Sequence, residues 1–446
     1  MQKKEKSFVQ LLWPDRSEEI YSKVHDFQTV EIVGQLRNNI QWLIHGDNVQ
    51  VLSTLSFGPT HKIIEKAGGI KMIYIDPPFE VGNDFYMRVQ IGEKKKTIKE
   101  LAYRDKWNGR RESYLSMIYT RLKLMHRLLA DDGCLLFHCD WRLNSKIRLI
   151  LDEIFGSENF VNEIIWSYRS GGVSKTESLP RKHDSILLFR KSKKFKIRPL
   201  KERQYLQKAF MGSKIDQDGR IYVDTLLRDV LEGEINIVRG NKIEKYNTRP
   251  VLNLSKERLD YPTQKPEGLL KLLIELTTDK NDLIADFFCG SGSTLAAAQQ
   301  LGRQWIGCDR SALAVHTAFK RLHELNNLQM SILQVVESTE NALFTFGYEI
   351  HRHRNKFSIT ITAFHNFDHR KGDMERWQDW IDYWAIDFKY IQAKGFKSDW
   401  CEFRTKKKRT LRLSSNSINV NISKNYLIGI RLVDVFARSA LKVIAL

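Results

Sequence analysis

The segment 283-LIADFFCGSGSTLAAAQQLGRQWIGCDRS-311 decides the fold class. It reads as an apolar strand ending at Asp286, a glycine loop, a helix, and a second strand ending at Asp309. This order is a βαβ unit, whose two strands lie parallel in one sheet. Strands and helices also alternate from about residue 31 to residue 191. The sequence therefore predicts an α/β protein with a mostly parallel sheet.

The glycine loop indicates which kind of ligand the sheet binds. Gly290 and Gly292 open the helix, but Leu295 stands where a dinucleotide loop has its third glycine. That third glycine serves a pyrophosphate, so its absence disfavours a NAD-linked oxidoreductase. Asp309, at the end of the next strand, can accept hydrogen bonds from ribose hydroxyls. A glycine-rich turn is often only a turn, but together these residues favour a nucleoside without phosphates.

A second motif, 71-KMIYIDPPF-79, ends another apolar strand. Pro77 and Pro78 cannot donate to a strand ladder, so the strand must stop after Asp76. A strand-ending turn would explain this much. The alternative is a ligand site, because open α/β sheets bind ligands at the carboxyl ends of their strands. A carboxylate, a stiff turn and the ring of Phe79 would then be held together there.

The charge balance points to a polyanionic partner. Lys and Arg number 72 against 53 Asp and Glu, giving a net charge of +19 and a pI near 9.5. Nucleic acid is the leading candidate, with anionic membrane surfaces second. No apolar run reaches the roughly 18 residues of a membrane span, and the apolar N-terminal stretch is too short for a signal peptide. We expect a cytoplasmic protein. Its five scattered cysteines have no metal-ligand spacing, so we expect no metal site.

Three motifs in a fixed order resemble a known family: DPPF at 76–79, YPTQKP at 261–266 and DFFCGSGST at 286–294. They resemble the beta-group exocyclic-amino DNA methyltransferases, which use S-adenosylmethionine and include the modification subunits of type III restriction systems. The resemblance implies a Rossmann-like methyltransferase sheet in permuted motif order, because the catalytic motif precedes the cofactor motif. It also implies an inserted recognition segment between the two motifs.

The resemblance assigns the catalytic residues. Asp76 and the backbone carbonyl of Pro77 would bind the two protons of the target amino group, and Pro78 would help to stiffen that turn. Phe79 would stack on a target base flipped out of the duplex. Asp47, in the GDN motif at 46–48, would lie near the same base.

The resemblance also assigns the cofactor residues. Phe288, Gly290 and Gly292 would wrap S-adenosylmethionine. Asp286 would lie beside its methionine part, and Asp309 would hold the ribose. The segment bordering the methionine end would comprise Thr263, Gln264 and Lys265.

The implied function is transfer of a methyl group to the N6 amino group of adenine in double-stranded DNA. Asp76 at the first motif position resembles adenine-specific members and argues against relatives that methylate RNA or protein glutamine. N4-cytosine methylation and a non-catalytic DNA-binding subunit with a decayed fold are the alternatives. The implied partners are DNA, a restriction subunit and a second copy of the chain, with nucleoid association through DNA and no membrane partner.

The pattern changes along the chain predict five regions. These are an N-terminal extension (1–30), the catalytic half (31–191), an irregular inserted recognition segment (192–255), the cofactor-binding half (256–328) and a small C-terminal α+β domain (329–446). In the last region, Trp377, Trp380 and Trp384 have the spacing of one helix face. Two basic runs, 94–96 and 406–409, are candidates for phosphate contacts or for solvated surface.

Overall fold

The computed structural model describes residues 9–14, 16–35, 39–93, 96–106, 111–169, 179–252, 255–325, 328–336, 343–354, 356–367, 376–419 and 427–445. Lys94 and Lys95 of the first basic run lie outside them. Among the described residues, no helix combines the length and the apolar character needed to cross a membrane.

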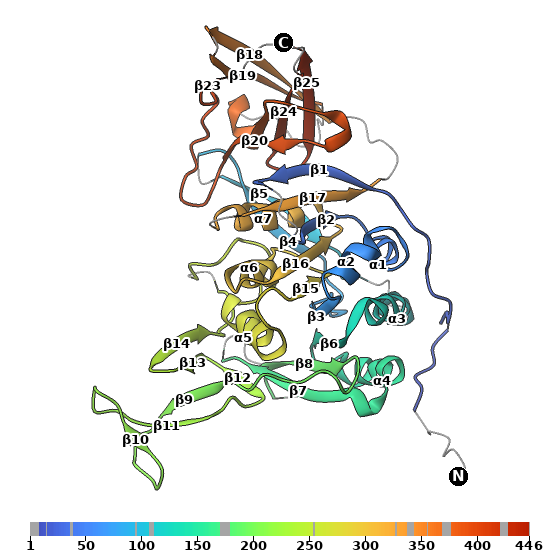
Figure 1. Ribbon diagram of the computed structural model, residues 1–446, viewed down its shortest axis with the longest axis vertical. Helices are drawn as coiled ribbons and strands as arrows, with labels where there is room; N and C mark the ends of the chain where they lie inside the picture. The colour runs from blue at the N-terminus through green and yellow to red at the C-terminus, as the bar shows by residue number, and fades with distance from the viewer. Residues whose placement is uncertain are drawn as a thin grey trace.

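An eleven-stranded sheet forms the centre of the molecule (Figure 1). Six adjacent strands, from β6 to β17, run parallel, and β8 lies antiparallel to both of its neighbours. β3 lies beside β15, although about 200 residues separate them in the chain, as the permuted motif order requires. The predicted α/β fold is confirmed. In sheet order the strands are β12 (Val230–Glu232), β7 (Phe160–Ser167), β8 (His183–Arg190), β6 (Leu129–Cys139), β3 (Ile70–Ile75), β15 (Leu283–Asp286), β16 (Gln304–Asp309), β2 (Gln41–His45), β17 (Met330–Val335), β1 (Phe27–Val33) and β21 (Lys397–Ser398).

Helices cover both faces of this sheet (Figure 1). One face carries α1 (Asn48–Phe57), α2 (Thr60–Lys66), α3 (Arg111–Leu128) and α4 (Asn144–Phe155), and the other carries α5 (Glu267–Thr277), α6 (Ser293–Gln300) and α7 (Ala312–His323).

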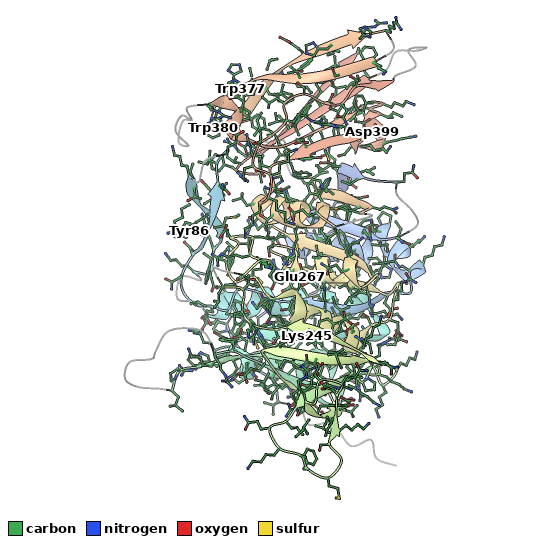
Figure 2. All side chains as sticks on the ribbon, turned by 90° about the vertical axis from the view of Figure 1, so that its left-hand side faces the viewer. Tyr86, Lys245, Glu267, Trp377, Trp380 and Asp399 are labelled. Atoms are coloured by element: carbon green, nitrogen blue, oxygen red, sulfur yellow. The ribbon has the colours of Figure 1, made fainter. Side chains whose placement is uncertain are left out.

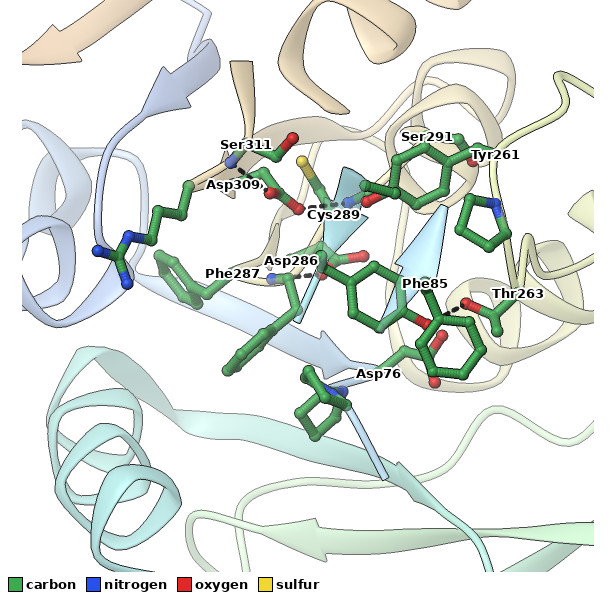
Figure 3. Close-up of a pocket in the computed structure, with 18 of the residues that line it drawn as sticks. Asp76, Phe85, Tyr261, Thr263, Asp286, Phe287, Cys289, Ser291, Asp309 and Ser311 are labelled. Atoms are coloured by element: carbon green, nitrogen blue, oxygen red, sulfur yellow. Dashed lines mark hydrogen bonds between the residues drawn. The ribbon is translucent and has the colours of Figure 1, made fainter. Parts of the chain in front are cut away.

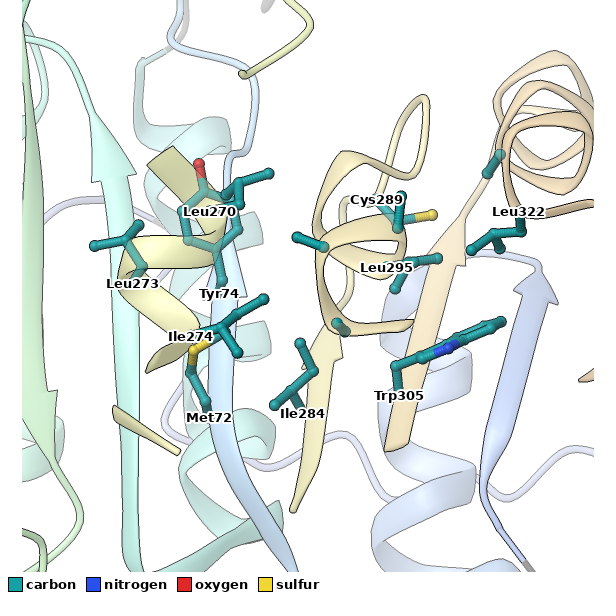
Figure 4. Packing of buried hydrophobic residues seen from close by; sticks show 14 of the residues in the cluster. Met72, Tyr74, Leu270, Leu273, Ile274, Ile284, Cys289, Leu295, Trp305 and Leu322 are labelled. Atoms are coloured by element: carbon teal, nitrogen blue, oxygen red, sulfur yellow. The ribbon is translucent and has the colours of Figure 1, made fainter. Parts of the chain in front are cut away.

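Strand β3 shows why this strand needs both layers of helices. Its residues alternate between the two cores, with Met72 and Tyr74 facing one cluster and Ile73 and Ile75 the other. Figure 4 shows Met72 and Tyr74 packed against α5. Each such side chain contributes about 1.5–3 kcal/mol on full burial. The strand bearing the DPPF motif is therefore firmly anchored.

The inserted segment is more regular than its sequence suggests. It forms a separate antiparallel sheet in the order β10-β11-β9-β13-β14, which extends from one end of the molecule (Figure 1). The prediction of an irregular segment is wrong, because strands such as β9 and β14 are short, rich in charged residues and mostly unburied, so their sequences carry little apolar alternation. Its strands are β9 (Lys201–Tyr205), β10 (Lys214–Ile215), β11 (Ile221–Leu226), β13 (Glu234–Arg239) and β14 (Lys242–Asn247).

The C-terminal region corrects a second prediction. Trp377 and Trp380 lie in η3 (Trp377–Trp380), a single 3-10 turn, and Trp384 lies in β20 (Ile381–Asp387), so the predicted helix is wrong. Every residue of β20 is buried, and a strand covered on both faces gives an apolar run that can imitate helical spacing. The described residues of this region form strands and short 3-10 turns rather than an α+β domain.

Two sheets build this C-terminal region. One has the order β18-β19-β23 and the other β22-β20-β24-β25. Strand β17 lies after the boundary predicted at residue 328 but pairs with β2 of the central sheet. The central sheet therefore continues past that boundary. The strands are β18 (Phe344–His353), β19 (Lys356–Asn366), β22 (Trp400–Phe403), β23 (Ile418–Asn419), β24 (Leu427–Asp434) and β25 (Ser439–Ala445), with a second 3-10 turn η4 (Gln392–Lys394).

Candidate active site

A cavity of about 790 Å³ opens at the carboxyl ends of β3, β15 and β16 (Figure 3). Twelve of the thirteen residues predicted for the catalytic, cofactor and target-base sites line this cavity: Asp47, Asp76, Pro77, Pro78, Phe79, Thr263, Gln264, Lys265, Asp286, Phe288, Gly290 and Asp309. Gly292 does not line the cavity. It caps α6 with φ +73°, and a Cβ there would lie 2.8 Å from the Cβ of Ala318. Its role is close packing between α6 and α7.

Asp76 has one occupied and one open carboxylate oxygen. Lys265, buried in the YPTQKP segment, donates from Nζ to Oδ2 of Asp76 at 2.5 Å. The other oxygen, Oδ1, is buried and has no hydrogen-bond partner among the described residues. An unpaired buried acceptor is costly unless a ligand satisfies it. The arrangement is therefore suited to receive an N–H group from a molecule in the cavity.

Phe79 is backed by a buried polar chain. Its ring stacks on His138 at 5.8 Å between ring centroids and 29° between planes. His138 Nε2 lies 3.2 Å from Asp184 Oδ2, and its Nδ1 lies 2.8 Å from the Tyr74 hydroxyl. Burial is the largest single effect on Asp184 and would raise its pKa, but the hydrogen bond and charge of His138, the charge of Lys265 and the hydrogen bond from Tyr168 together lower that pKa below its usual range. A charged Asp184 thus fixes the orientation of the ring behind Phe79.

Asp286 ends β15 in the middle of the cavity. Its carboxylate accepts hydrogen bonds from the Thr294 hydroxyl at 2.6 Å and from the Phe288 backbone N–H at 3.0 Å. These bonds favour the charged form, but burial outweighs them and raises the pKa of Asp286 to about 7, with smaller contributions from Asp76 and Asp309. Asp286 is therefore poised to ionise when a cation enters.

Asp309 ends β16 beside the glycine loop. It accepts from the backbone N–H groups of Gly290 and Ser311, each at 2.9 Å, which leaves lone pairs for ligand hydroxyls. Burial raises its pKa above the usual range. Gly290 has φ +48°, and a Cβ there would lie 3.1 Å from the ring of Tyr261. The loop thus needs glycine both for its backbone and for the space between loop and ring.

Asp47 lines the cavity just after the end of β2. It caps α1 by accepting from Val49 N–H at 3.0 Å, and Arg121 donates to the same oxygen at 2.7 Å. It follows β2, which is separated from β3 by β16 and β15. The neighbouring Asn48 donates to the carbonyl of Phe287 at 2.8 Å. Placement of Asp47 near the target base stays a prediction.

The YPTQKP segment joins the two halves of the site. Gln264 accepts a hydrogen bond from Leu259 N–H and donates one to the Glu257 carbonyl. Both bonds are to backbone groups nearby in the sequence, so Gln264 stabilises the loop that carries it. Thr263 has φ +55°, and its hydroxyl lies 3.0 Å from that of Tyr103. Lys265 reaches Asp76 instead. Of the three, Lys265 makes the contact with the catalytic motif.

Sequence reasoning missed several lining and supporting residues. Tyr261 and Tyr103 line the cavity, but aromatic residues at such positions commonly belong to the hydrophobic core. No sequence pattern therefore distinguished them as site residues. His138 and Asp184 sit on separate strands and meet only because β6 pairs with β8. The one available signal was polar residues at the ends of buried strands, in 137-FHCD-140 and 183-HDS-185.

The fold and this cavity define a class: a Rossmann-like α/β protein that combines a nucleoside-type loop with a DPPF motif. Residues 70–320 match the model of the N6/N4 methyltransferase family, described as DNA methylase. The chain belongs to this family. The resemblance inferred from the three motifs is confirmed.

Individual relatives are similar over part of their length. The type II methyltransferase M.EcaI of Enterobacter cloacae is 31% identical over 56% of this chain and 64% of its own. The EcoP15I Mod subunit of a type III restriction-modification enzyme from Escherichia coli is 27% identical over 42% of this chain and 29% of its own. The DNA adenine methyltransferase YhdJ of Escherichia coli K12 is 23% identical over 64% of this chain and 83% of its own. The chain thus spans less than two thirds of the length of M.EcaI and of EcoP15I Mod.

Proposed function

We propose that the protein is an adenine-specific DNA methyltransferase that uses S-adenosylmethionine. The proposal rests on Oδ1 of Asp76, which is buried without a hydrogen-bond partner among the residues that the structure describes and lies in the same cavity as Asp286 and Asp309. One end of the cavity offers an acceptor for an amino group, and the other offers a glycine loop and a ribose acceptor. A methyl donor and an exocyclic amine would thereby meet in one place.

The residues present fit this cofactor. Asp309 retains lone pairs for two ribose hydroxyls, and Gly290 leaves open space beside Tyr261. Asp286 can face the cationic methionine end. When bound, S-adenosylmethionine supplies a methyl group on a positively charged sulfur. Leu295, at the place of the third glycine of a dinucleotide loop, agrees with a cofactor that has no phosphate.

The chemistry of the amine explains the DPPF motif. The lone pair of the adenine N6 nitrogen is delocalised into the ring, so the amine is a weak nucleophile. Hydrogen bonds to Oδ1 of Asp76 and to the carbonyl of Pro77 favour a pyramidal nitrogen with a directed lone pair. Lys265 holds the other oxygen of Asp76 and so fixes the carboxylate. The nitrogen forms the new bond to the methyl carbon, the bond from that carbon to sulfur breaks with its electron pair going to sulfur, and the nitrogen releases one proton to water.

The surface at the carboxyl end of β6, beside the strand that leads to Asp76, has side chains suited to binding DNA. Trp141 follows β6, the strand that pairs with β3, and its side chain is 49% exposed. The guanidinium of Arg181 lies 3.7 Å from the centre of its ring, and that of Arg142 lies 5.1 Å from it. Cations beside an exposed aromatic ring bind phosphates and bases together. A base flipped from DNA on this edge would enter beside Phe79.

Further partners follow from the relatives. The name of EcoP15I Mod makes it a subunit of a restriction-modification enzyme, and a restriction subunit is the corresponding partner proposed here. Homodimerisation is a separate proposal, which light scattering on the purified protein tests. Association with the nucleoid would follow from DNA binding.

The proposed activity is tested by identifying the methylated base. The purified protein is incubated with duplex DNA and methyl-labelled S-adenosylmethionine, and the nucleosides are separated after digestion. Label in N6-methyladenine supports the proposal. Label in N4-methylcytosine would keep the mechanism and overturn the base assignment. Absence of label together with no cofactor binding would support the alternative of a decayed DNA-binding subunit.

A further inference from the structure

The β4–β5 hairpin connects the cavity to the C-terminal region. Its strands, β4 (Phe85–Gln90) and β5 (Thr97–Tyr103), directly follow the DPPF motif. Phe85 and Tyr103 pair at its base with their rings stacked, 4.8 Å between centroids, and both line the cavity. Tyr103 also meets the hydroxyl of Thr263. This end of the hairpin forms one wall of the cofactor site.

The approach to the hairpin is fixed as well. Asp105, which is fully buried just after β5, accepts from the backbone N–H groups of Glu80 and Val81 at 3.0 and 2.8 Å. The segment that leaves the DPPF motif is therefore bonded to the segment that returns from the hairpin. These two bonds hold the end of the DPPF turn, so a shift of the hairpin would be transmitted to Phe85 and not to the DPPF turn.

The inner face of the hairpin belongs to the core of the C-terminal region. Met87, Val89 and Ala102 are buried in one cluster with Trp380 and Trp384. The opposite face is exposed, as at Tyr86, which is 45% exposed. Figure 2 shows Tyr86 on the hairpin below Trp377 and Trp380. The period-2 pattern of burial shows that the hairpin is packed as an extra layer on this region.

Arg409 forms hydrogen bonds to the backbone at the turn end of the hairpin. Its guanidinium donates from Nη2 to the carbonyl of Gln90 at 3.1 Å, and from Nη2 and Nε to the carbonyl of Gly92 at 2.8 and 3.1 Å. Gly92 is itself enclosed, because a Cβ there would lie 2.1 Å from Oδ1 of Asp379. The last residue of the basic run 406–409 thus binds protein backbone and not phosphate.

The other cations of this run behave differently. Lys406, Lys407 and Lys408 are exposed. Lys406 donates to the Arg258 carbonyl at 3.0 Å, and Lys408 pairs with Glu402. Lys407 is therefore a matched control for Arg409, since removing it takes the same charge from the same run and leaves the hairpin contacts intact.

We propose that the C-terminal region holds the β4–β5 hairpin against the cofactor cavity, with Arg409 as the positioning residue. The identity of the ligand rests on the proposed function. The cavity wall formed by the hairpin is then held in place by a region outside the central sheet. Cofactor affinity therefore depends on contacts that are remote from the cofactor. This gives the C-terminal region a role in methyl transfer that does not require it to contact DNA.

The test compares full-length Arg409→Met, Lys407→Met and wild-type protein. Calorimetry with S-adenosylhomocysteine measures cofactor affinity, and hydrogen exchange followed by mass spectrometry measures opening of Phe85–Gln90 and Thr97–Tyr103. We expect Arg409→Met to weaken binding at least about tenfold and to speed exchange in both strands about tenfold. Lys407→Met leaves both unchanged. In turnover assays Arg409→Met raises the KM for S-adenosylmethionine, with kcat and the KM for DNA within twofold of wild type.

A second variant tests the same contact independently of Arg409. Gly92→Ala disturbs the same contact from the hairpin side and is expected to reproduce the Arg409→Met phenotype. Affinity and exchange within twofold of wild type in both variants would overturn the inference, as would equal effects of Lys407→Met. If the wild-type protein itself fails to bind S-adenosylhomocysteine, the proposed function fails, while the exchange rates alone still decide whether Arg409 holds the hairpin.

Discussion

At the scale of single residues, three carboxylates share one cavity. Asp76, Asp286 and Asp309 end three adjacent strands, and their proximity adds to burial in raising the pKa of Asp286. Such a cluster is costly in an empty protein and is relieved by a cation. The residue arrangement therefore favours a positively charged ligand over a neutral or anionic one.

This cluster predicts how cofactor affinity depends on pH. With a pKa of about 7, Asp286 is mostly protonated at pH 6 and must lose its proton to face the cationic methionine end. Binding is thus expected to tighten by roughly tenfold per pH unit below 7 and to level off above it. Calorimetry with S-adenosylmethionine at pH 5.5 to 8, without DNA, measures the trend. In Asp286→Asn the trend should be absent, and an equally steep profile in that variant would contradict the assignment.

At the scale of elements, the inserted sheet is the candidate for recognising DNA sequence. The turn between β9 and β10 carries Phe210 and Met211, which are 56% and 98% exposed. Lys208 and Lys214 flank them in the sequence. Apolar side chains presented beside cations can insert between or stack on bases. The insert extends away from the central sheet (Figure 1), so it can reach DNA beyond the target base.

Replacing the apolar tip should affect DNA and spare the cofactor. We expect Phe210→Ser with Met211→Ser to weaken binding of the target duplex by roughly tenfold, since a lost aromatic–base stack costs about 1–3 kcal/mol. Fluorescence anisotropy with labelled DNA measures this, and S-adenosylhomocysteine affinity serves as the control. Unchanged DNA affinity would exclude the tip as a contact. Phe367→Ser, at an exposed site in the C-terminal region, is the matched control.

The elements also show how far sequence reasoning reaches. The parallel strands were predictable because β3 and β15 are apolar runs that end on Asp and on Pro or Gly signals. β20 was not, because a strand buried on both faces carries no period of its own. In the site, the motif residues were found, but the bond from Lys265 to Asp76 and the stack of Phe79 on His138 depend on strand order. No local pattern encodes such pairings.

At the scale of the whole molecule, the net charge of +19 predicts strongly salt-dependent DNA binding. If the protein contacts about six to ten phosphates, affinity should fall about 10³- to 10⁵-fold between 50 and 200 mM salt. Anisotropy titrations across this range give the slope. Arg181→Gln, which removes the guanidinium beside Trp141, is expected to reduce that slope by about 1. An unaltered slope would remove Arg181 from the DNA surface.

We expect Oδ1 of Asp76 to bind the target amine, and single-turnover methylation by Asp76→Ala measures what this contact contributes. Removing this acceptor should slow methyl transfer to duplex DNA by about 10²-fold or more, as loss of one preorganised polar contact does in other enzymes. S-adenosylhomocysteine affinity should stay within twofold. Asp76→Ala alone leaves the buried ammonium of Lys265 without its partner. The double variant with Lys265→Met removes this charge too, and its methyl transfer should be as slow as that of Asp76→Ala. A rate within threefold of wild type in either variant would contradict the account.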